Sequence, residues 1–501
     1  MPRKREPYKG HQSKLVVAVD IGTTFTAASF CILEPGVVPE FREVLRWKKQ
    51  KVPDAKVPSV IYYNKQGQVQ AFAAETDEEE VIAEAELRDW EKSQWFKLHL
   101  RPGYLPVVPG LSVPPLPARK TVVDAITDFL RYVKEEVIES IASSCGVGKA
   151  SWMRLRSTLR LVLTTPNGWE GKQQHRMRVA AIQAGFVGKD DGNSVQFLSE
   201  PEAAVLYAIE TGSMDDWLKK DSHLLVCDCG GGTIDVTGYR VKEVEPLWLE
   251  ETTMPKCYLG GAILVGQAAR KFLEQKLKGT VYDNPDAIQR AVENFDNKAK
   301  KSFDGTEEYK LVCLPGHTSI PELCITKGRI KINGSDVKYF FKESLDMINL
   351  GLMNAYENDD EMADVEFVHL VLVGGLANSP YIYKEVLAWA DDHHIDVVRP
   401  EGLLSKAVPH GALSWYLDDP IDARITKASY GVEMLNEYDP ALHDALRRKP
   451  KRDIDGIDYV DKVWDCILPK ARYASPEKPG ESLTIRVGLA RGGGHKRKYC
   501  N

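Results

Sequence analysis

The sequence lacks the features of membrane-spanning and secreted proteins. No apolar run approaches the roughly 20 residues that cross a bilayer, and the first residues carry no apolar signal-peptide core. The 9 cysteines are scattered and odd in number, which suits a reducing compartment better than a disulfide framework. We therefore expect no membrane association and a cytoplasmic location. A nuclear location is the alternative, because residues 1–13 are basic and polar, a composition that fits an import signal as well as a flexible tail.

A strong net charge is also missing. The formal net charge is -6, with 66 Lys and Arg against 72 Asp and Glu. Because nucleic-acid binding needs a basic face or stripe, this balance argues against nucleic acid as a partner. With 43% hydrophobic and 28% charged residues the chain is typical of globular proteins, and its 501 residues exceed one ordinary core. Two or more domains are therefore expected.

The chain does contain a glycine-rich hairpin. Residues 224–236 read LLVCDCGGGTIDV, in which an apolar strand ends at Asp228, breaks at three glycines and resumes at Thr233. Glycine adopts the positive φ angles of tight turns, and a turn without side chains brings several backbone N–H groups within reach of a phosphate. Asp228 has the chemistry to hold a hydrated magnesium ion beside those phosphates. On this stretch alone, an ordinary glycine-rich hairpin is an equally good interpretation.

A second stretch repeats the pattern. Residues 15–26 read LVVAVDIGTTFT, again an apolar strand that ends in an aspartate, Asp20, followed by a glycine turn and threonine hydroxyls. Two such hairpins far apart in one chain indicate duplicated lobes that face each other across a ligand. The sequence therefore predicts duplicated lobes that face each other across a nucleotide.

Two charged residues need an explanation of their own. Ser199 and Glu202 have the spacing of a helix capping box and Pro201 suits the first helical turn, which leaves Glu200 without a capping role. Glu200 either faces the cleft or stabilises the helix dipole. Lys97 is the cation in the apolar stretch QWFKLHL, where spacing alone favours a surface lysine beside a helix.

Local patterns predict most of the other elements. Hydrophobic periodicity and charge patterns predict helices over 77–95, 121–141, 173–184, 200–209 and 262–278. Residues 324–332 and 337–340 are expected to form a hairpin. Residues 102–117 contain six prolines and predict a rigid loop.

Together these motifs resemble the actin, sugar-kinase and heat-shock-chaperone ATPase superfamily. Five motifs occur in the same order as in the nucleotide-binding half of the 70-kilodalton heat-shock (DnaK-type) chaperones, over roughly residues 14–432. The resemblance implies the α/β, two-lobed actin-like ATPase fold, in which duplicated mixed-sheet domains surround a nucleotide cleft. It also implies ATP or ADP and magnesium as cofactors.

The resemblance also implies roles for individual residues. Asp20, Asp228 and Glu200 correspond to the residues around the magnesium ion, largely through water. Asp228, Glu200 and Lys97 correspond to the catalytic residues, with Lys97 positioning the attacking water. Contacts to the nucleotide are implied for two phosphate hairpins, a glycine pair before a helix, a basic helix and an adenosine motif. These residues are Gly22, Thr23, Thr24, Gly230, Gly231, Gly232, Thr233, Gly260, Gly261, Lys300, Lys301, Gly374, Gly375 and Asn378.

The sequence departs from the family pattern at the base and beyond the ATPase region. In typical relatives arginines cover both faces of the adenine, whereas the matching positions here are Lys301 and Asn378. No acidic-apolar linker follows Gly431, and residues 432–501 are too few for a full peptide-binding domain and lid. The resemblance therefore supports ATP binding more strongly than a complete chaperone cycle.

The expected organisation follows from these matches. We expect a flexible tail at 1–13, a first lobe at 14–222, a second lobe at 223–402, a return to the first lobe at 403–431 and a partly disordered extension at 432–501. The expected function is a slow, magnesium-dependent ATPase resembling the 70-kilodalton chaperones, with client or co-chaperone proteins as partners. The alternatives are a non-hydrolysing ATP-binding scaffold and a small-molecule kinase of the same fold; no sugar-binding pattern supports the kinase.

Overall fold

The protein is described by a computed structural model. One compact unit ends at Pro420 and a second begins at Ile421. None of the described helices combines the length and the apolar character needed to cross a membrane. The structure describes residues 5–106, 108–144, 150–214, 217–357, 367–400, 406–425, 429–441, 450–452, 456–468 and 473–474.

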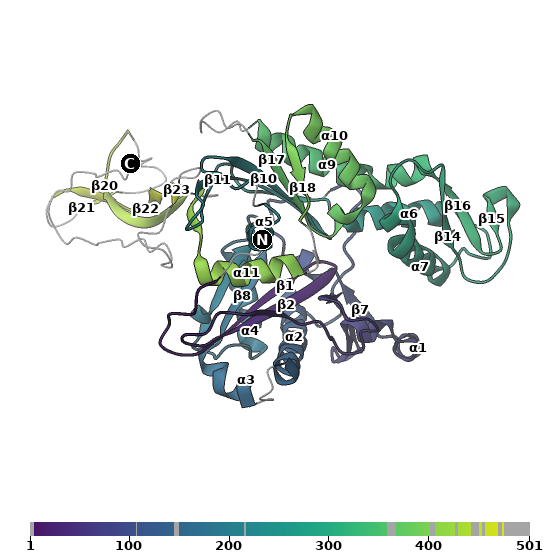
Figure 1. Ribbon diagram of the computed structural model, residues 1–501, viewed down its shortest axis with the longest axis horizontal. Coiled ribbons are helices and arrows are strands. Elements are labelled where there is room, and N and C mark those ends of the chain that lie inside the picture. Colours follow the sequence, from purple (N-terminus) through teal and green to yellow (C-terminus); the bar gives the residue numbers. More distant parts are fainter. Residues whose placement is uncertain are drawn as a thin grey trace. The chain divides into compact units, whose positions relative to one another are not determined.

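The first lobe is built on a mixed sheet in the order β3-β2-β1-β8-β9, with β4 paired to β2 (Figure 1). Strands β1 and β2 form an antiparallel hairpin, whereas β8 and β9 run parallel to β1. The central strands β1 and β8 are near-continuous apolar runs, as expected where helices cover both faces of a sheet. Their bounds are β1 (Lys14–Ile21), β2 (Phe25–Leu33), β3 (Phe41–Glu43), β4 (Lys56–Pro58), β8 (Arg160–Thr165) and β9 (Val195–Ser199).

The second lobe repeats this topology strand for strand. Its sheet has the order β12-β11-β10-β17-β18, with β13 paired to β11, so that β10 and β11 form the hairpin and β17 and β18 run parallel to β10. The predicted duplication and two-lobed α/β fold are therefore confirmed. The strands are β10 (His223–Cys229), β11 (Thr233–Glu243), β12 (Trp248–Glu251), β13 (Lys256–Leu259), β17 (His369–Val373) and β18 (Asp396–Val398).

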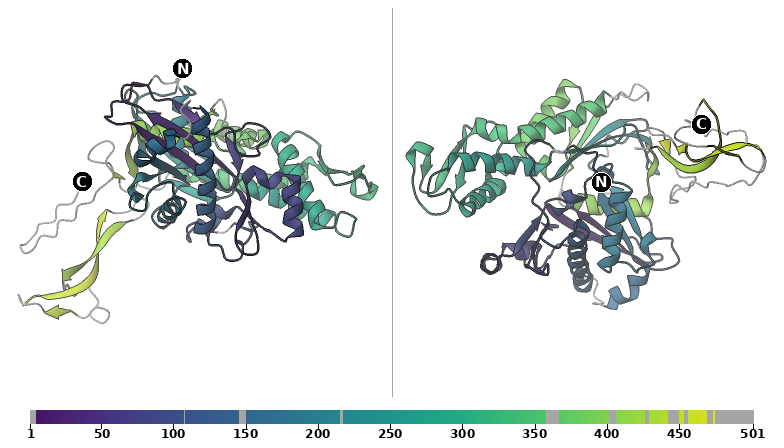
Figure 2. Two further views of the ribbon diagram at one scale, coloured as in Figure 1. Left: turned by 90° about the horizontal axis from the view of Figure 1, so that it is seen from below. Right: turned by 180° about the vertical axis from the view of Figure 1, so that it is seen from behind.

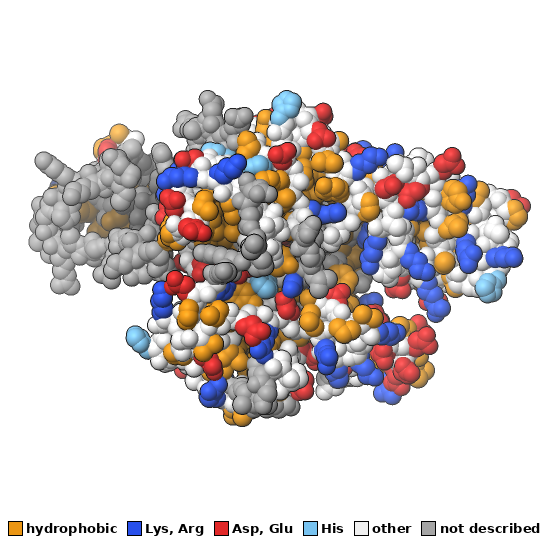
Figure 3. Space-filling view, in the orientation of Figure 1, with side chains coloured by type: hydrophobic (Ala, Val, Ile, Leu, Met, Phe, Trp, Pro, Cys, Tyr) orange, Lys and Arg blue, Asp and Glu red, His pale blue; other side chains and the backbone are white. Residues whose placement is uncertain are grey.

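Helices pack on the sheets of both lobes (Figures 1 and 2). The helices of the first lobe are α2 (Val122–Ser144), α3 (Ala150–Leu155), α4 (Lys172–Gln183), α5 (Glu200–Glu210) and α11 (Ala407–Asp418), of which α3 packs on α2 and the others contact the sheet. The helices of the second lobe are α6 (Ala262–Lys276), α7 (Pro285–Asn294), α8 (Lys300–Ser302), α9 (Gly334–Tyr356) and α10 (Pro380–Asp392), of which α9 and α10 contact the sheet. On the face drawn in Figure 3, acidic and basic side chains are interspersed.

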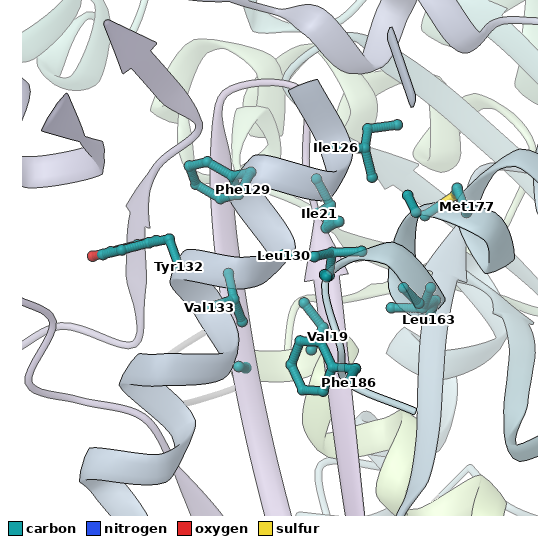
Figure 4. Packing of buried hydrophobic residues seen from close by; sticks show 14 of the residues in the cluster. Val19, Ile21, Ile126, Phe129, Leu130, Tyr132, Val133, Leu163, Met177 and Phe186 are labelled. Carbon is teal, nitrogen blue, oxygen red and sulfur yellow. The ribbon is translucent and has the colours of Figure 1, made fainter. Parts of the chain in front are cut away.

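The two faces of the first sheet bury different side chains. Val19 and Leu163 pack against Phe129 of α2 and Met177 of α4 on one face (Figure 4). Replacing a buried phenylalanine such as Phe129 by alanine typically costs about 3–5 kcal/mol of stability. The opposite face packs against α5 and α11. Alternate residues of β1 therefore face alternate helical layers, which places Asp20 on the side of α11.

Helices α5 and α11 cross at the junction of the lobes. Helix α5 contacts β8 and β9 of the first sheet and β10 and β17 of the second. A side chain at Gly411 of α11 would place its Cβ 1.7 Å from the carbonyl oxygen of Ala203 in α5, so only glycine permits this close crossing. The chain thus returns to the first lobe through α11, inside the predicted return segment 403–431, of which residues 403–405 and 426–428 lie outside the described part.

The N-terminal segment is anchored beside this crossing. Arg5 donates hydrogen bonds to Glu210 at the end of α5 and to Ser414 and Asp418 of α11, and its guanidinium lies 4.4 Å from the ring centroid of Phe41. These contacts argue against the flexible tail predicted for residues 1–13 as far as Arg5 is concerned. Residues 1–4 lie outside the described part of the chain.

Two local predictions are wrong. The helix predicted over 77–95 ends early, since α1 covers Glu79–Leu87 and β7 (Glu91–Gln94) pairs with β5 (Val60–Tyr63) beside β6 (Val69–Phe72). Asp89, at a φ of 50°, lies in the turn between α1 and β7. The acidic pattern could not reveal this, because the strand is fixed by pairing with a distant segment.

The predicted hairpin of 324–332 with 337–340 is also wrong. Strand β16 (Arg329–Asn333) pairs with β14 (Tyr309–Cys313) and β15 (Ile325–Thr326). Residues 337–340 belong to α9, where Val337, Phe340 and Phe341 are buried at helical spacing. A short apolar run does not distinguish strand from helix, and here the longer 3.6-residue period decides.

The C-terminal unit consists of short antiparallel ladders. Strand β19 (Ile421–Ile425) pairs with β23 (Tyr473–Ala474). Strand β22 (Asp458–Leu468) pairs with β20 (Tyr430–Glu437) and β21 (Lys451–Arg452). Residues 475–501, which include the end predicted to be disordered, lie outside the described part of the chain.

Candidate functional site

The glycine turns of the two lobes touch each other. A Cβ added at Gly231 would lie 2.3 Å from Oγ1 of Thr24, and one added at Gly232 would lie 2.5 Å from Oγ1 of Thr23. Any side chain at these glycines would therefore push the two turns apart. The approach explains why the sequence needs glycine here, and it places the threonine hydroxyls of one lobe against the backbone of the other.

The carbonyl groups of the second turn accept hydrogen bonds from the segment at the start of α6. The N–H groups of Gly260, Ala262 and Ile263 donate to the carbonyls of Gly232, Gly230 and Gly231, at 3.2, 3.1 and 3.0 Å. Within the described residues, the N–H groups of Gly231 and Gly232 have no hydrogen-bond acceptor. A turn with fixed carbonyls and free amides has the character of an anion-binding nest.

Gly260 and Gly261 pack against the side of this turn that faces away from the cavity. A Cβ at Gly261 would lie 2.4 Å from the carbonyl carbon of Gly231, and one at Gly260 would lie 2.7 Å from the side chain of Met347. Neither glycine lines the cavity described next. Their position indicates a packing role, whereas the resemblance had implied a contact to the nucleotide.

All other predicted site residues line one cavity of about 940 Å³. The cavity lies between the lobes, with β1 and β2 on one side and β10, β11 and the segment after β17 on the other. The residues are Asp20, Gly22, Thr23, Thr24, Lys97, Glu200, Asp228, Gly230, Gly231, Gly232, Thr233, Lys300, Lys301, Gly374, Gly375 and Asn378.

Two aspartates end equivalent strands at this cavity. Asp20 is the penultimate residue of β1 and accepts a 3.2 Å hydrogen bond from the hydroxyl of Thr164. Asp228 is the penultimate residue of β10, and burial, followed by the nearby Asp235 carboxylate, raises its pKa to about 7. A cation in the cavity would relieve this cost, because it would favour the ionised carboxylate.

Lys97 is buried, and this overturns the surface lysine that spacing alone favoured. Its side chain is 3% exposed and its Nζ lies 2.5 Å from Oε1 of Glu200. Burial raises the pKa of Glu200, against the lowering effect of Lys97. Burial alone would lower the pKa of Lys97, but Glu200 and Asp20 raise it above its ordinary value, so Lys97 is charged at neutral pH. Glu200 thus faces the cavity, as one of its two sequence interpretations required.

The wall on the side of the second lobe carries the remaining predicted residues. Gly374 has a φ of +93°, and a Cβ there would lie 2.3 Å from Oδ1 of Asp228. Lys300 is ion-paired with Asp296 at 2.6 Å. Lys301 and Asn378 are both exposed at the cavity surface. These two side chains are therefore accessible to a ligand.

Sequence reasoning missed three residues of the site. Asp235 is buried, and burial raises its pKa to about 6 against the lowering effect of a hydrogen bond from the Asn167 backbone. Asp235 shares a strand face with Thr233, and this period of two could have revealed it. Asn167 and the cavity-lining Lys56 carry no such local signal.

A directly ligated metal centre is absent from the described residues. No three His, Cys, Asp or Glu side chains among them are grouped closely enough to hold an ion. Asp20, Asp228 and Glu200 supply oxygen donors, the ligands that magnesium prefers, and magnesium usually keeps several of its waters. The cavity therefore fits a hydrated magnesium ion better than a dehydrated one.

Comparison with known proteins gives relatives along nearly the whole chain. No protein-family model matches it. Heat shock 70 kDa protein 12A of Mus musculus is 24% identical, over 96% of this chain and 82% of the relative. Heat shock 70 kDa protein 12B of Homo sapiens is 22% identical over 88% of this chain and 74% of the relative. Chaperone protein dnaK1 of Prochlorococcus marinus is 27% identical over 71% of this chain and 51% of the relative. With its duplicated sheets and paired glycine turns, the chain is an Hsp70-like member of the actin, sugar-kinase and heat-shock-protein superfamily.

Proposed function

We propose that the protein binds ATP with magnesium between its lobes and hydrolyses it slowly, as a chaperone-like ATPase. The observation that carries this proposal is the contact of the two glycine turns, Gly231 on Thr24 and Gly232 on Thr23, beside the carboxylates of Asp20 and Asp228. Each lobe contributes one turn and one carboxylate, so a triphosphate bound there would touch both lobes.

The residues present fit such a ligand. The free amides of Gly231 and Gly232 and the hydroxyls of Thr23 and Thr24 are donors of the kind that phosphate oxygens accept. The cavity of about 940 Å³ also falls within the range of ligand pockets.

Magnesium would supply charge neutralisation for the phosphate oxygens when bound. The chain's own residues would do the rest. The turn amides and threonine hydroxyls would bind the phosphates, and Asp228 would orient a water molecule for in-line attack on the terminal phosphorus. Lys97, held by Glu200, would place a fixed positive charge beside the reacting group. Phosphoryl transfer depends mainly on positioning and charge stabilisation, so no strong base is needed.

One observation favours a second candidate, the non-hydrolysing ATP-binding scaffold. The ammonium of Lys97 is already engaged by Glu200 at 2.5 Å, which restrains it from positioning a water molecule. If this ion pair persists with nucleotide bound, binding would occur without turnover. The small-molecule kinase has no comparable observation in its favour.

Binding and turnover of the purified full chain test the proposal. Calorimetry with a non-hydrolysable ATP analogue and magnesium should give a binding signal, and phosphate release should show slow hydrolysis. Asp228→Asn should lower turnover by roughly 10²-fold, a loss typical of a reacting group that is no longer correctly positioned. The variant should remain folded, because the side chain keeps its size. Binding with no turnover would select the scaffold, and turnover only with an added sugar would select the kinase.

The cellular role is part of the same proposal. Free cysteines such as Cys31, Cys227 and Cys229 suit the reducing, ATP-rich interior of a cell, and imaging of a tagged chain tests this location. Client or co-chaperone proteins are the proposed partners. Co-purification in the presence of ATP and of ADP tests whether any such partner responds to nucleotide.

A further inference from the structure

Lys56 stands in the same cross-strand row as Asp20. In the first sheet Asp20 lies opposite Ala27, and Ala27 lies opposite Lys56. Directly opposed residues of antiparallel strands point to the same face, so all three side chains share one face of the sheet. It is the face that carries Val16 and Ala18, which pack against α11.

This face opens into the cavity at the start of α11. Ala407 and Val408, the first two residues of α11, line the cavity together with Asp20 and Lys56. Neighbouring strands are about 4.8 Å apart, so Asp20 and Lys56 arise roughly 10 Å apart, on either side of β2. Because the residue between them is alanine, the Lys56 side chain has room to extend toward the space in front of Asp20.

The backbone fixes Lys56 relative to the first glycine turn. The N–H of Ser59 donates to the carbonyl of Thr24 at 2.9 Å, and the hydroxyls of Ser59 and Thr26 lie 2.9 Å apart. The carbonyl of Lys56 itself accepts a 2.8 Å hydrogen bond from Gln50. The strand that carries Lys56 is thus tied to the turn whose threonines line the cavity.

The charges of the cavity leave Lys56 available. Lys97 is committed to Glu200 and Lys300 to Asp296. In the part of the chain that the structure describes, the Lys56 ammonium has no carboxylate within the 4 Å of an ion pair. The Lys56 charge acts on Asp228 of the second lobe. A cation outside any ion pair, on the wall of a cavity lined with hydrogen-bond donors for phosphate, suits an anionic ligand group.

We propose that Lys56 is a phosphate-binding residue that contacts the terminal phosphate of a nucleoside triphosphate, and that it makes the site favour triphosphate over diphosphate. The inference deepens the proposed function and rests on it. Its geometric basis is the row of Asp20, Ala27 and Lys56. Lys56 extends toward the space in front of Asp20 and Thr24. We therefore expect its ammonium to contact the terminal phosphate, which a diphosphate lacks.

The test compares the affinities of a non-hydrolysable ATP analogue and of ADP, both with magnesium, by calorimetry on the full chain. Lys56→Met should weaken the triphosphate about tenfold, the loss of one charge-assisted contact, and change ADP by less than about twofold. Lys56→Arg keeps the charge and should retain most of the preference. The matched control is Lys51→Met, which removes an exposed lysine five residues earlier that lies outside the cavity.

The outcomes separate the inference from the function beneath it. If Lys56→Met weakens both nucleotides equally, or neither, while its melting temperature matches the wild type, the inference is wrong and the proposed function stands. A wild-type chain that binds neither nucleotide overturns both. If Lys56→Met does not fold, Lys56→Gln replaces it in the same comparison, with the same expected loss of triphosphate preference.

Discussion

The backbone N–H of Asn167 donates a 2.8 Å hydrogen bond to Oδ1 of Asp235, and this bond joins the first lobe to the second. The Asn167 side chain strengthens the link, since its Nδ2 donates to Oγ1 of Thr237 at 3.0 Å and to the carbonyl of Lys256 at 3.1 Å. Asn167 is 2% exposed. One residue in the loop after β8 thus orients an acidic side chain of the site and ties β11 and β13 to the opposite lobe.

Asn167→Ala should therefore destabilise the protein. The backbone bond to Asp235 remains, but the hydroxyl of Thr237 and the carbonyl of Lys256 lose a buried donor. Leaving buried polar groups unsatisfied costs about 1–3 kcal/mol. Denaturant unfolding measures this, with Asn193→Ala as a control at an exposed asparagine of the same lobe. Equal unfolding free energies for the two variants would show that the side-chain link contributes nothing.

Gly261→Ala should harm the site more than Gly260→Ala. The added Cβ at Gly261 meets the backbone of Gly231, which cannot move without displacing the turn, whereas at Gly260 it meets the flexible side chain of Met347. Overpacking of this kind typically costs about 1–3 kcal/mol. We expect Gly261→Ala to lower both the melting temperature and the affinity for ATP, as measured by thermal scans and calorimetry.

Gly103→Ala is the control for both variants, because nothing lies within 4 Å of its added Cβ. It should change neither the melting temperature nor the ATP affinity. A Gly261→Ala protein that binds ATP as tightly as this control would contradict the packing role assigned to Gly261.

The glycine motifs and the strand-end aspartates were predictable because their information is local. An apolar run that ends in an aspartate and turns at glycine, as at Asp20 and Asp228, predicts a hairpin in any chain that contains it. The duplication then implied two equivalent lobes, and the sheets confirm it. What the motifs did not contain was the direction in which each glycine faces, so Gly260 and Gly261 were assigned to the ligand instead of to the back of the turn.

The positions that local patterns could not explain depend on contacts between distant segments. Lys97 looked like a surface lysine because its partner, Glu200, lies 103 positions away in the chain. Lys56 reaches the cavity through the register of β4 on β2, and Asn167 through its bonds to β11 and β13. No periodicity within either segment specifies such pairings. They follow from tertiary packing, which decides where a short polar motif ends up.

Acid should weaken the contact that holds α11 on the first sheet. Oε1 of Glu43 in β3 lies 2.8 Å from Nζ of Lys406 and 3.4 Å from Nδ1 of His410. The adjacent His410 imidazole is the largest influence and, with Lys406, lowers the pKa of Glu43 from 4.5 to about 2. A carboxyl whose pKa falls on folding stabilises the folded state fully above its unfolded pKa and loses this contribution as pH falls through the folded pKa.

We therefore expect Glu43→Gln to be less stable than the wild type above about pH 5 and the difference to shrink as the pH falls from 4.5 toward 2. Urea unfolding at several pH values measures the difference. Glu40→Gln, at an exposed carboxylate of the same segment, should show a smaller difference throughout. A difference in unfolding free energy between Glu43→Gln and wild type that stays constant down to about pH 2.5 would contradict the stabilising role assigned to Glu43.

The last prediction concerns recognition of the base, where this chain departs from its relatives. Lys301 and Asn378 are exposed on the cavity wall, at the positions where the resemblance implies arginines over the two faces of adenine. A guanidinium is planar, weakly hydrated and stacks on a flat ring, whereas an ammonium is a strongly hydrated point charge and asparagine is uncharged. Each lost cation–π contact is worth about 0.5–2 kcal/mol.

Losing both contacts should weaken nucleotide affinity by roughly one to two orders of magnitude, since about 1.4 kcal/mol is a factor of ten. The phosphate contacts are unaffected, so we expect binding on the order of micromolar or weaker, with ATP preferred over GTP by only a small factor. The double variant Lys301→Arg with Asn378→Arg should tighten ATP more than GTP. Lys298→Arg, an exposed lysine of the same segment outside the cavity, should change neither. Calorimetry that finds tight and strongly adenine-selective binding by the unmodified chain would overturn the placement of the base between Lys301 and Asn378.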